Sequence, residues 1–189
     1  MHAQDICRFW LEECTPEQWY RQDDALDATI AERFGKAVTD AQDGAFEDWL
    51  TGGEGALALL LLLDQFSRNI FRGSGQSFAG DARARAIAAK AIAADWDREI
   101  AGPGRQFFYL PHMHSEDLAE QDQCIAWFEA RMPEASNNLL HARVHREIIA
   151  RHGRFPYRNA ALGRVSTPEE KEFLAEGGYG KILAEIEGR

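Results

Sequence analysis

The sequence predicts an all-α fold, with residues 1–189 forming a single domain of antiparallel helical hairpins. Apolar residues recur at three- and four-residue spacing along most of the chain, which is the pattern of amphipathic helices. Helix-start signals accompany this periodicity, and alternating strand patterns flanked by turn residues are absent. A chain of 189 residues with 45% hydrophobic content carries enough apolar surface for one compact core.

Two helix starts carry the same capping signal. Thr15 and Thr167 each precede a proline, and a glutamine or glutamate follows each threonine three residues later. A hydroxyl and a longer polar side chain at that spacing satisfy the free backbone N–H groups of a first helical turn, and proline fits the first helical position. We therefore expect one helix after Thr15 and another after Thr167.

The other helices are predicted from periodicity. Segment 24–41 has apolar residues every three or four positions, and Gly44 follows it as a stop signal. Similar reasoning predicts helices over 46–51, 55–72, 77–97, 115–132, 134–151 and 168–176. Two segments, 102–111 and 153–166, are expected to be loops. Successive helices joined by short loops favour hairpins stacked as a bundle or short superhelix.

Charge and cysteine content narrow the functional classes. The chain has 31 acidic and 21 basic residues, a net charge of −10, which argues against a nucleic-acid partner. Its longest apolar run, 56–63, is far shorter than the roughly 18 to 20 residues that span a bilayer, and its start does not resemble a signal peptide. Three cysteines without a Cys-x-x-Cys pair indicate a reducing compartment. We expect a cytoplasmic monomer or weak homodimer with no membrane partner.

Polar residues continue the apolar face of the helix expected at 55–72. At 100° per residue, Asp64, Arg68 and Arg72 adjoin the face that Leu57 and Leu61 begin. Asp64 and Arg68 are four residues apart with the acid first, the favourable order for a helical ion pair. Two interpretations remain open, an ordinary solvated helix end and an inward-facing polar cluster.

The helix expected at 115–132 raises the same question. Asp117 and Gln121 are four residues apart and lie in or beside the apolar arc that includes Ile125 and Phe128. A carboxylate on a buried face is costly unless it is paired or hydrogen-bonded. We expect Asp117 to have a cationic or donor partner, either in a functional site or in a salt bridge that ties helices together.

Three histidines, His141, His145 and His152, share the apolar stripe of the helix expected at 134–151. His141 and His145 have the four-residue spacing that lets two imidazoles bind one metal ion. No His-Glu-x-x-His sequence or cysteine ligand set accompanies them. We therefore expect core histidines with hydrogen bonds, no metal and no cofactor.

Segment 141–164 reverses the charge balance of the chain. It contains six arginines against Glu147 alone, a local charge of +5. Arginine suits a carboxylate or phosphate ligand, and the interleaved Phe155 and Tyr157 could stack on a flat ligand or hold the loop in place. In the alternative interpretation, these arginines pair with acidic helices of the same protein.

Several ordered motifs resemble the DUF924 family of uncharacterised bacterial proteins, over nearly the whole chain. They are Phe9-Trp10, Glu32 to Gly35, Leu62 to Gly73, Phe108 to Pro111, His114 to Asp117 with Gln121, His145 to Ile149 and Gly153 to Asn159. The resemblance implies an all-α fold similar to tetratricopeptide-repeat proteins, and no established activity. His112, His152 and Tyr157 depart from the family pattern, which has an apolar residue, phenylalanine and histidine there, and His141 lies outside the motifs.

Three functions remain open for the polar residues that match these motifs. The first is a tetratricopeptide-like binding module whose polar groove grips an acidic peptide or a small anion. The candidate ligand-binding residues are Asp64, Arg68, Asn69, Arg72, Glu116, Gln121, Arg154, Arg158 and Asn159.

The second function is an enzyme acting on a small anionic substrate. Its candidate catalytic residues are His114 or His145 as general acid or base, with Asp117 orienting the imidazole. Arg68, Arg72, Arg154 and Arg158 are the candidate anion clamps. In the third interpretation, the motif residues form a buried polar network that fixes helix packing, and the function lies on another surface.

Overall fold

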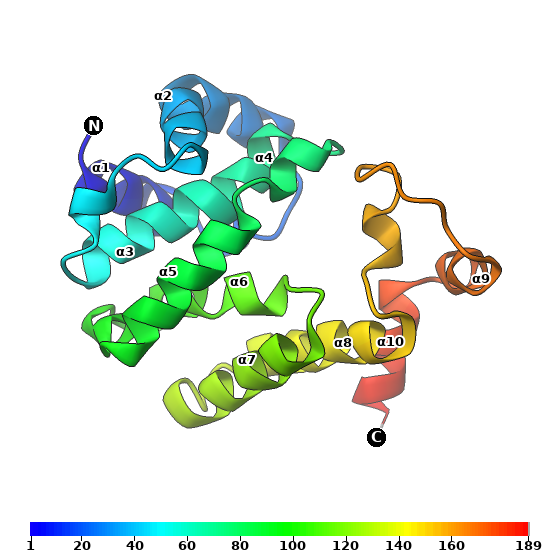
Figure 1. Ribbon diagram of the computed structural model, residues 1–189. Coiled ribbons are helices and arrows are strands. Elements are labelled where there is room, and N and C mark those ends of the chain that lie inside the picture. The colour runs from blue at the N-terminus through cyan, green and yellow to red at the C-terminus, as the bar shows by residue number, and fades with distance from the viewer. Residues whose placement is uncertain (189) are drawn as a thin grey trace. The chain divides into compact units, whose positions relative to one another are not determined.

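The computed structural model describes residues 1–188, and within this range it is helical with no β-strand (Figure 1). The all-α prediction is confirmed. The chain divides into two compact units, unit 1 over Met1–Pro111 and unit 2 from His112 onward. No helix in the described part of the chain is long and apolar enough to cross a membrane.

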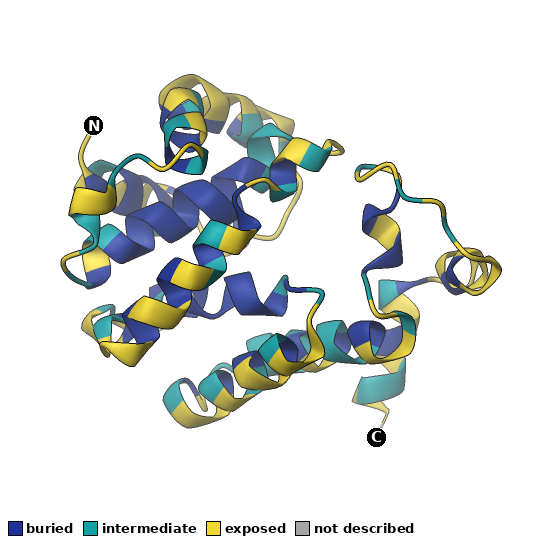
Figure 2. Ribbon diagram, in the orientation of Figure 1, coloured by how far each residue is buried: buried dark blue, intermediate teal, exposed yellow. Residues whose placement is uncertain are grey.

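Unit 1 is built around one long buried helical rod. The rod consists of α3, the π-helical segment η3 and α4, which follow one another without a break, and Figure 2 shows most of α3 and all of η3 buried. The elements of unit 1, in chain order, are α1 (Ala3–Arg8), η1 (Phe9–Glu13), α2 (Asp24–Gln42), η2 (Glu47–Trp49), α3 (Gly53–Leu60), η3 (Leu61–Phe66), α4 (Ser67–Ile70), η4 (Gly75–Phe78), α5 (Asp81–Ala93), η5 (Trp96–Glu99) and η6 (Gly102–Phe108).

The core of unit 1 is formed by leucines and aromatic rings. Every residue from Ala56 to Leu63 is fully buried. The Phe66 ring lies 5.2 Å from the Trp10 ring and 5.1 Å from the Phe34 ring, so the rod packs against η1 and α2. Burial of this apolar surface is the main stabilising contribution to the unit.

Local signals explain the limits of α2. The carboxylate of Asp23 accepts hydrogen bonds from the N–H groups of Ala25 and Leu26, which is an N-cap. Gly44 adopts φ +102° just after the helix, in the left-handed region that favours glycine. The predictions of helix 24–41 and of the stop at Gly44 are confirmed.

Several boundaries in unit 1 differ from the prediction. The residues after Thr15 form turns rather than a helix, although the Thr15 N–H does bond the Gln18 side chain at 2.8 Å. The Trp19 indole N–H donates to the carbonyl of Trp10, which holds this segment against η1. Segment 102–111, expected as a loop, is mostly the 3₁₀ helix η6.

The helix expected at 77–97 is divided into η4, α5 and η5. Gly80 stands at the first division, where a Cβ atom would lie 2.7 Å from the carbonyl oxygen of Leu63. The close approach of two backbones therefore separates η4 from α5, and periodicity does not report it.

Unit 2 contains a helical hairpin and a C-terminal helix that packs on it. After α6 (Leu110–Met113), which crosses the unit boundary, come α7 (Leu118–Arg131), α8 (Ser136–His152), η7 (Pro156–Arg158), α9 (Pro168–Ala175) and α10 (Tyr179–Glu187). Helices α7 and α8 lie side by side, and α10 packs against α8 (Figure 1). Thr167 and Glu170 form the predicted capping box at the start of α9.

The core of unit 2 lies between α8 and the C-terminal helices. Val144, Ile148 and Ile149 of α8 form one cluster with Phe155, Phe173 and Ile182. Helix α10 was not predicted, although Ile182, Leu183 and Ile186 have helical spacing. All three cysteines of the chain are buried free thiols.

Candidate functional site

The first cluster of predicted site residues lies on the rod of unit 1. Asp64 belongs to η3 and is only 1% exposed, so the inward-facing interpretation is the correct one for this residue. Nη1 of Arg68 lies 3.1 Å from Oδ1 of Asp64, and Nη2 lies 3.1 Å from the carboxylate of Asp81. Arg68 therefore bridges η3 to the start of α5.

Asn69 and Arg72 connect the same rod to α2. The Arg72 guanidinium donates to both carboxylate oxygens of Asp27, at 2.8 to 3.0 Å. The Asn69 amide donates to Oδ1 of Asp27 at 2.6 Å. Asn69 on α4 and Arg72 in the turn after it thus join this end of the rod to α2. Their partner Asp27 lies more than forty positions away, so local spacing does not reveal it.

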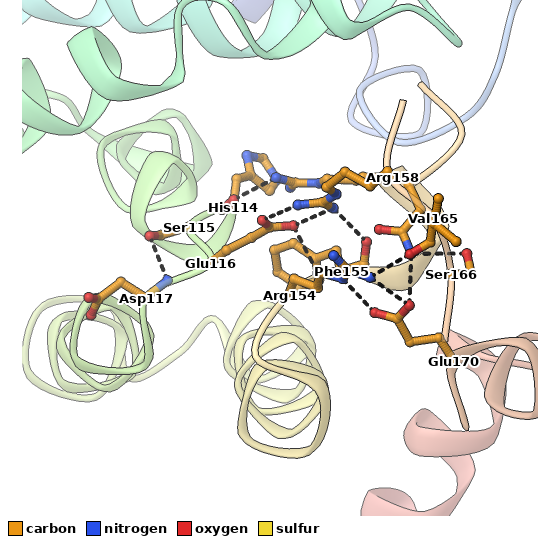
Figure 3. Close-up of polar contacts among 12 residues, drawn as sticks. His114, Ser115, Glu116, Asp117, Arg154, Phe155, Arg158, Val165, Ser166 and Glu170 are labelled. Atoms are coloured by element: carbon orange, nitrogen blue, oxygen red, sulfur yellow. Dashed lines mark hydrogen bonds and ion pairs between the residues drawn. The ribbon is translucent and has the colours of Figure 1, made fainter. Parts of the chain in front are cut away.

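In unit 2, Glu116 joins the turn before α7 to the loop after α8 (Figure 3). It accepts hydrogen bonds from the Phe155 N–H at 2.9 Å and from Arg164 at 2.6 and 2.9 Å. Burial acts to raise the pKa of Glu116, but the guanidinium of Arg164 and the Phe155 N–H outweigh it, so the pKa lies below its ordinary value.

The Glu170 carboxylate accepts hydrogen bonds from several residues of the loop 153–167. Arg154 binds it through two hydrogen bonds, at 2.6 and 2.9 Å, and Asn159 donates to it at 3.0 Å (Figure 3). The Thr167 N–H adds a fourth bond at 2.8 Å. Chiefly through the Arg154 hydrogen bond, the pKa of Glu170 falls to about 2. The spacing of Glu170 from Thr167 predicts a helix cap and gives no sign of these other donors.

Gln121 and Arg158 hold the turn that carries His114. Gln121 is fully buried and donates to the carbonyls of Met113 and Ser115, at 2.6 and 2.7 Å. Arg158 donates to the carbonyl of His114 at 2.9 Å, and its guanidinium lies 4.3 Å from the Phe155 ring centroid.

Asp117 has a different role from the one predicted. Its side chain is exposed and accepts from the N–H groups of Ala119 and Glu120, which caps the start of α7. Figure 3 shows its carboxylate directed away from His114. The expectation of a buried Asp117 that orients a histidine is wrong, because the helix begins at Leu118 and not at Ser115.

His145 lies among aromatic rings with its tautomer determined by one hydrogen bond. Its Nδ1 donates to the carbonyl of His141 at 2.8 Å, which leaves Nε2 as the unprotonated nitrogen. The rings of Phe155, Tyr179 and His114 lie 5.4, 5.3 and 6.1 Å away. Burial, followed by the nearby His114 and Arg158, lowers the pKa of His145 to about 3.

His145 is therefore neutral at pH 7.

A pocket of about 480 Å³ opens beside these rings. Tyr157, Leu174, Gly177, Gly178 and Tyr179 line it, and we call it the tyrosine pocket. Tyr157 is 42% exposed and stacks on Phe155 with ring centroids 5.3 Å apart. The Tyr179 hydroxyl is hydrogen-bonded to Nδ1 of His141 at 2.5 Å. Of these residues, Tyr157 is the one with a stacking role predicted from the sequence, whereas no local signal points to Leu174 or Tyr179.

The predicted site residues thus form separate groups. Unit 1 holds Asp64, Arg68, Asn69 and Arg72, and unit 2 holds His114, Glu116, Asp117, Gln121, His145, Arg154, Arg158 and Asn159. Within residues 1–188, no group of three or more histidine, cysteine, aspartate or glutamate side chains is arranged to hold a metal ion.

Fold and site define an all-α protein whose polar motif residues are joined by ion pairs within each unit. Residues 6–178 match the family described as bacterial protein of unknown function (DUF924), so the chain belongs to this family. A similar solved structure is a protein of unknown function, ATU0120 from Agrobacterium tumefaciens. It is 42% identical, and the match covers 93% of this chain and 97% of that one with a TM-score of 0.87. No curated protein matches the chain.

Proposed function

We propose that this protein is a binding module and that its ligand occupies the tyrosine pocket of unit 2. The observation that carries the proposal is the pocket itself, which two tyrosines, Leu174 and two adjacent glycines line. Its volume of about 480 Å³ suits a ring-sized group, and apolar concave sites with a few polar atoms are the usual ligand sites of proteins.

The pocket favours a ligand with an aromatic or apolar ring. Tyr157 and Tyr179 offer ring faces, and Leu174 adds an apolar contact. Tyr157 is supported from behind by Phe155, and Tyr179 by His145, so the walls are packed on other rings. A peptide side chain and a small planar molecule share this chemistry.

A carboxylate beside the ring completes the proposed ligand class, an acidic peptide or a small organic anion. Lys171 is exposed and stands three residues before Leu174 on α9, which places the two side chains on one helix face. Three of the four expected arginine clamps do not support anion binding, since Arg68, Arg72 and Arg154 are occupied by carboxylates of their own units.

The contacts of the motif residues favour the structural interpretation for those residues. Ion pairs and hydrogen bonds to Asp27, Glu116 and Glu170 join elements that are far apart in the chain. Such satisfied networks rigidify a fold. The binding module and the structural network therefore belong to different residues of one protein. A tetratricopeptide-like superhelix and the single domain stay expectations, and the proposal needs neither.

The enzyme hypothesis has less support. A general base works best with a pKa near the working pH, and His145 has a pKa of about 3. Asp117 caps a helix and is not available to orient an imidazole. His145 acts in this proposal as a neutral ring that supports Tyr179.

The test uses two fluorinated probes that differ in one charge. N-acetyl-5-fluorotryptophan carries a carboxylate, and N-acetyl-5-fluorotryptophanamide is neutral; ¹⁹F NMR titration reports their binding. We expect the acid to bind with Kd on the order of 0.1 to 1 mM, and more tightly than the amide. Lys171→Gln should remove this preference.

Matched variants locate the binding. Tyr157→Ala should weaken binding of both probes about tenfold, a loss of one stacked ring. Tyr20→Ala, which removes an exposed tyrosine of unit 1, is the control and should leave binding unchanged. Absence of binding to the wild type, or equal binding to Tyr157→Ala, would overturn the proposal.

A further inference from the structure

Most of the tyrosine pocket belongs to one segment of the chain. Leu174, Gly177, Gly178 and Tyr179 all lie in residues 168–187, which comprise α9 and α10 and which we call the C-terminal segment. The segment is docked on α8 by the core cluster described above, so the pocket exists only while the segment stays docked.

The docking face of α8 carries three histidines. His141 is hydrogen-bonded to the Tyr179 hydroxyl, and the ring of His145 lies 5.3 Å from the Tyr179 ring. The ring of His152 lies 4.5 Å from that of Phe173 on α9. Each of these histidines therefore contacts the segment that forms the pocket.

These histidines face the C-terminal segment in their neutral form. Nε2 of His152 is buried without a hydrogen-bond partner among the described residues, so a proton there would have no acceptor. Burial also lowers the pKa of His141 and His152. The acidic side chains that face them, Glu187 for His141 and Glu170 for His152, act in the opposite direction but do not outweigh burial.

The cationic neighbours of the histidines act together with burial. Arg151 disfavours a charge on His152, while Arg158 and His114 disfavour one on His145. Arg151 is itself paired with Glu147 on α8 and with Glu185 on α10. A proton on His145 or His152 therefore adds positive charge beside an arginine, and a proton on His141 adds charge where burial outweighs the attraction of Glu187.

We propose that acidification regulates the tyrosine pocket, because protons on His141 and His152 loosen the C-terminal segment from α8 and release the ligand below about pH 6. This inference rests on the proposed function of the pocket. The loosened state exposes histidines with ordinary pKa values near 6.5, whereas the docked state resists protonation. The docking equilibrium of the C-terminal segment is thus unaffected above pH 6.5. Below this pH, its equilibrium constant falls by up to about tenfold for each histidine and each pH unit.

The binding test compares N-acetyl-5-fluorotryptophan at pH 7.5 and 5.5, where its carboxylate stays ionised. For the wild type we expect Kd to rise about tenfold or more at pH 5.5. The double variant His141→Asn and His152→Phe keeps an acceptor for Tyr179 and an aromatic ring against Phe173. Its Kd should rise several-fold less than that of the wild type between the two pH values, because His145 is then the remaining histidine of the docking face that can titrate. His2→Asn, an exposed histidine of unit 1, is the control and should behave as the wild type.

A second readout needs no ligand. Amide hydrogen exchange of residues 168–187, corrected for the intrinsic pH dependence of exchange, should show lost protection at pH 5.5 in the wild type and a smaller loss in the double variant. Failure of the probe to bind at pH 7.5 would contradict the proposed function and leave this readout intact. Unchanged protection at pH 5.5, or an unchanged Kd, would overturn the regulatory inference.

Discussion

Glu170 illustrates how single residues stabilise unit 2. Four donors converge on its carboxylate, from Arg154, Asn159 and the Thr167 backbone, although the side chain sits in the first turn of α9. A helix N-terminus already favours an anion. The same carboxylate therefore caps a helix and attaches the preceding loop to it, and one charge serves two structural purposes.

Replacing this carboxylate by an amide tests the role directly. Glu170→Gln presents an NH₂ group to donors and should lower the free energy of unfolding by about 2 kcal/mol. Urea denaturation at pH 7 measures the change, and the exposed Glu172→Gln on the same helix should change it by less than about 0.5 kcal/mol. Equal effects of the two substitutions would contradict the assigned role.

At the scale of elements, the buried rod of unit 1 depends on close backbone contact. The break between η4 and α5 occurs where Gly80 meets the carbonyl of Leu63. The rod itself contains an irregularity, the π-helical segment η3, which includes Asp64. Such π-helical turns are rare, and they require tertiary packing to hold them.

A pair of glycine substitutions separates packing from propensity. Gly80→Ala forces a Cβ to 2.7 Å from the Leu63 carbonyl oxygen and should destabilise the protein by about 1 to 3 kcal/mol. Gly35→Ala, inside α2 with no atom within 4 Å of the added Cβ, should instead stabilise it by about 0.5 to 1 kcal/mol. Thermal unfolding of both variants measures this; a stable Gly80→Ala protein would disprove the close contact.

At the scale of the whole molecule, most arginines of the basic segment are paired with carboxylates of the same protein. In the basic segment 141–164, five arginines bind carboxylates of unit 2. The alternative in which these arginines pair with acidic groups of the same protein is the one that the contacts favour. The local charge of +5 is consequently not a free cationic surface.

Stability of the molecule should fall as the pH is lowered from 7 to 5. The pKa of His145 is about 3 in the folded protein and near 6.5 in the unfolded chain, so the unfolded chain takes up the proton first. The contribution of neutral His145 to the free energy of unfolding is fully present above pH 6.5, and about 1 to 2 kcal/mol of it is lost by pH 5.

Urea denaturation at pH 7 and pH 5 measures this loss, and His145→Gln should reduce it. Glu116 and Glu170 do not interfere, because groups with lowered carboxyl pKa values lose their stabilising contribution only below about pH 4.5. A pH-independent unfolding free energy between 7 and 5 would contradict the burial of a neutral His145.

Local interactions made much of the helical fold predictable from the chain alone. The limits of α2 follow from Asp23, apolar spacing and Gly44, and the start of α9 follows from the Thr167 capping box, since these signals act within a few residues. The polar motif residues follow from the resemblance to the family, and helical periodicity independently places several of them on or beside apolar faces.

The ion-pair partners of the arginines and the tyrosine pocket, by contrast, depend on long-range packing. Arg72 binds Asp27, and Arg164 binds Glu116, over separations of 45 and 48 residues. Nothing in local spacing distinguishes these acids from the other carboxylates of the chain. The tyrosine pocket likewise forms only when α10 brings Tyr179 beside the loop that carries Tyr157. Helices arise from neighbours in sequence, whereas sites arise from burial that brings distant side chains together.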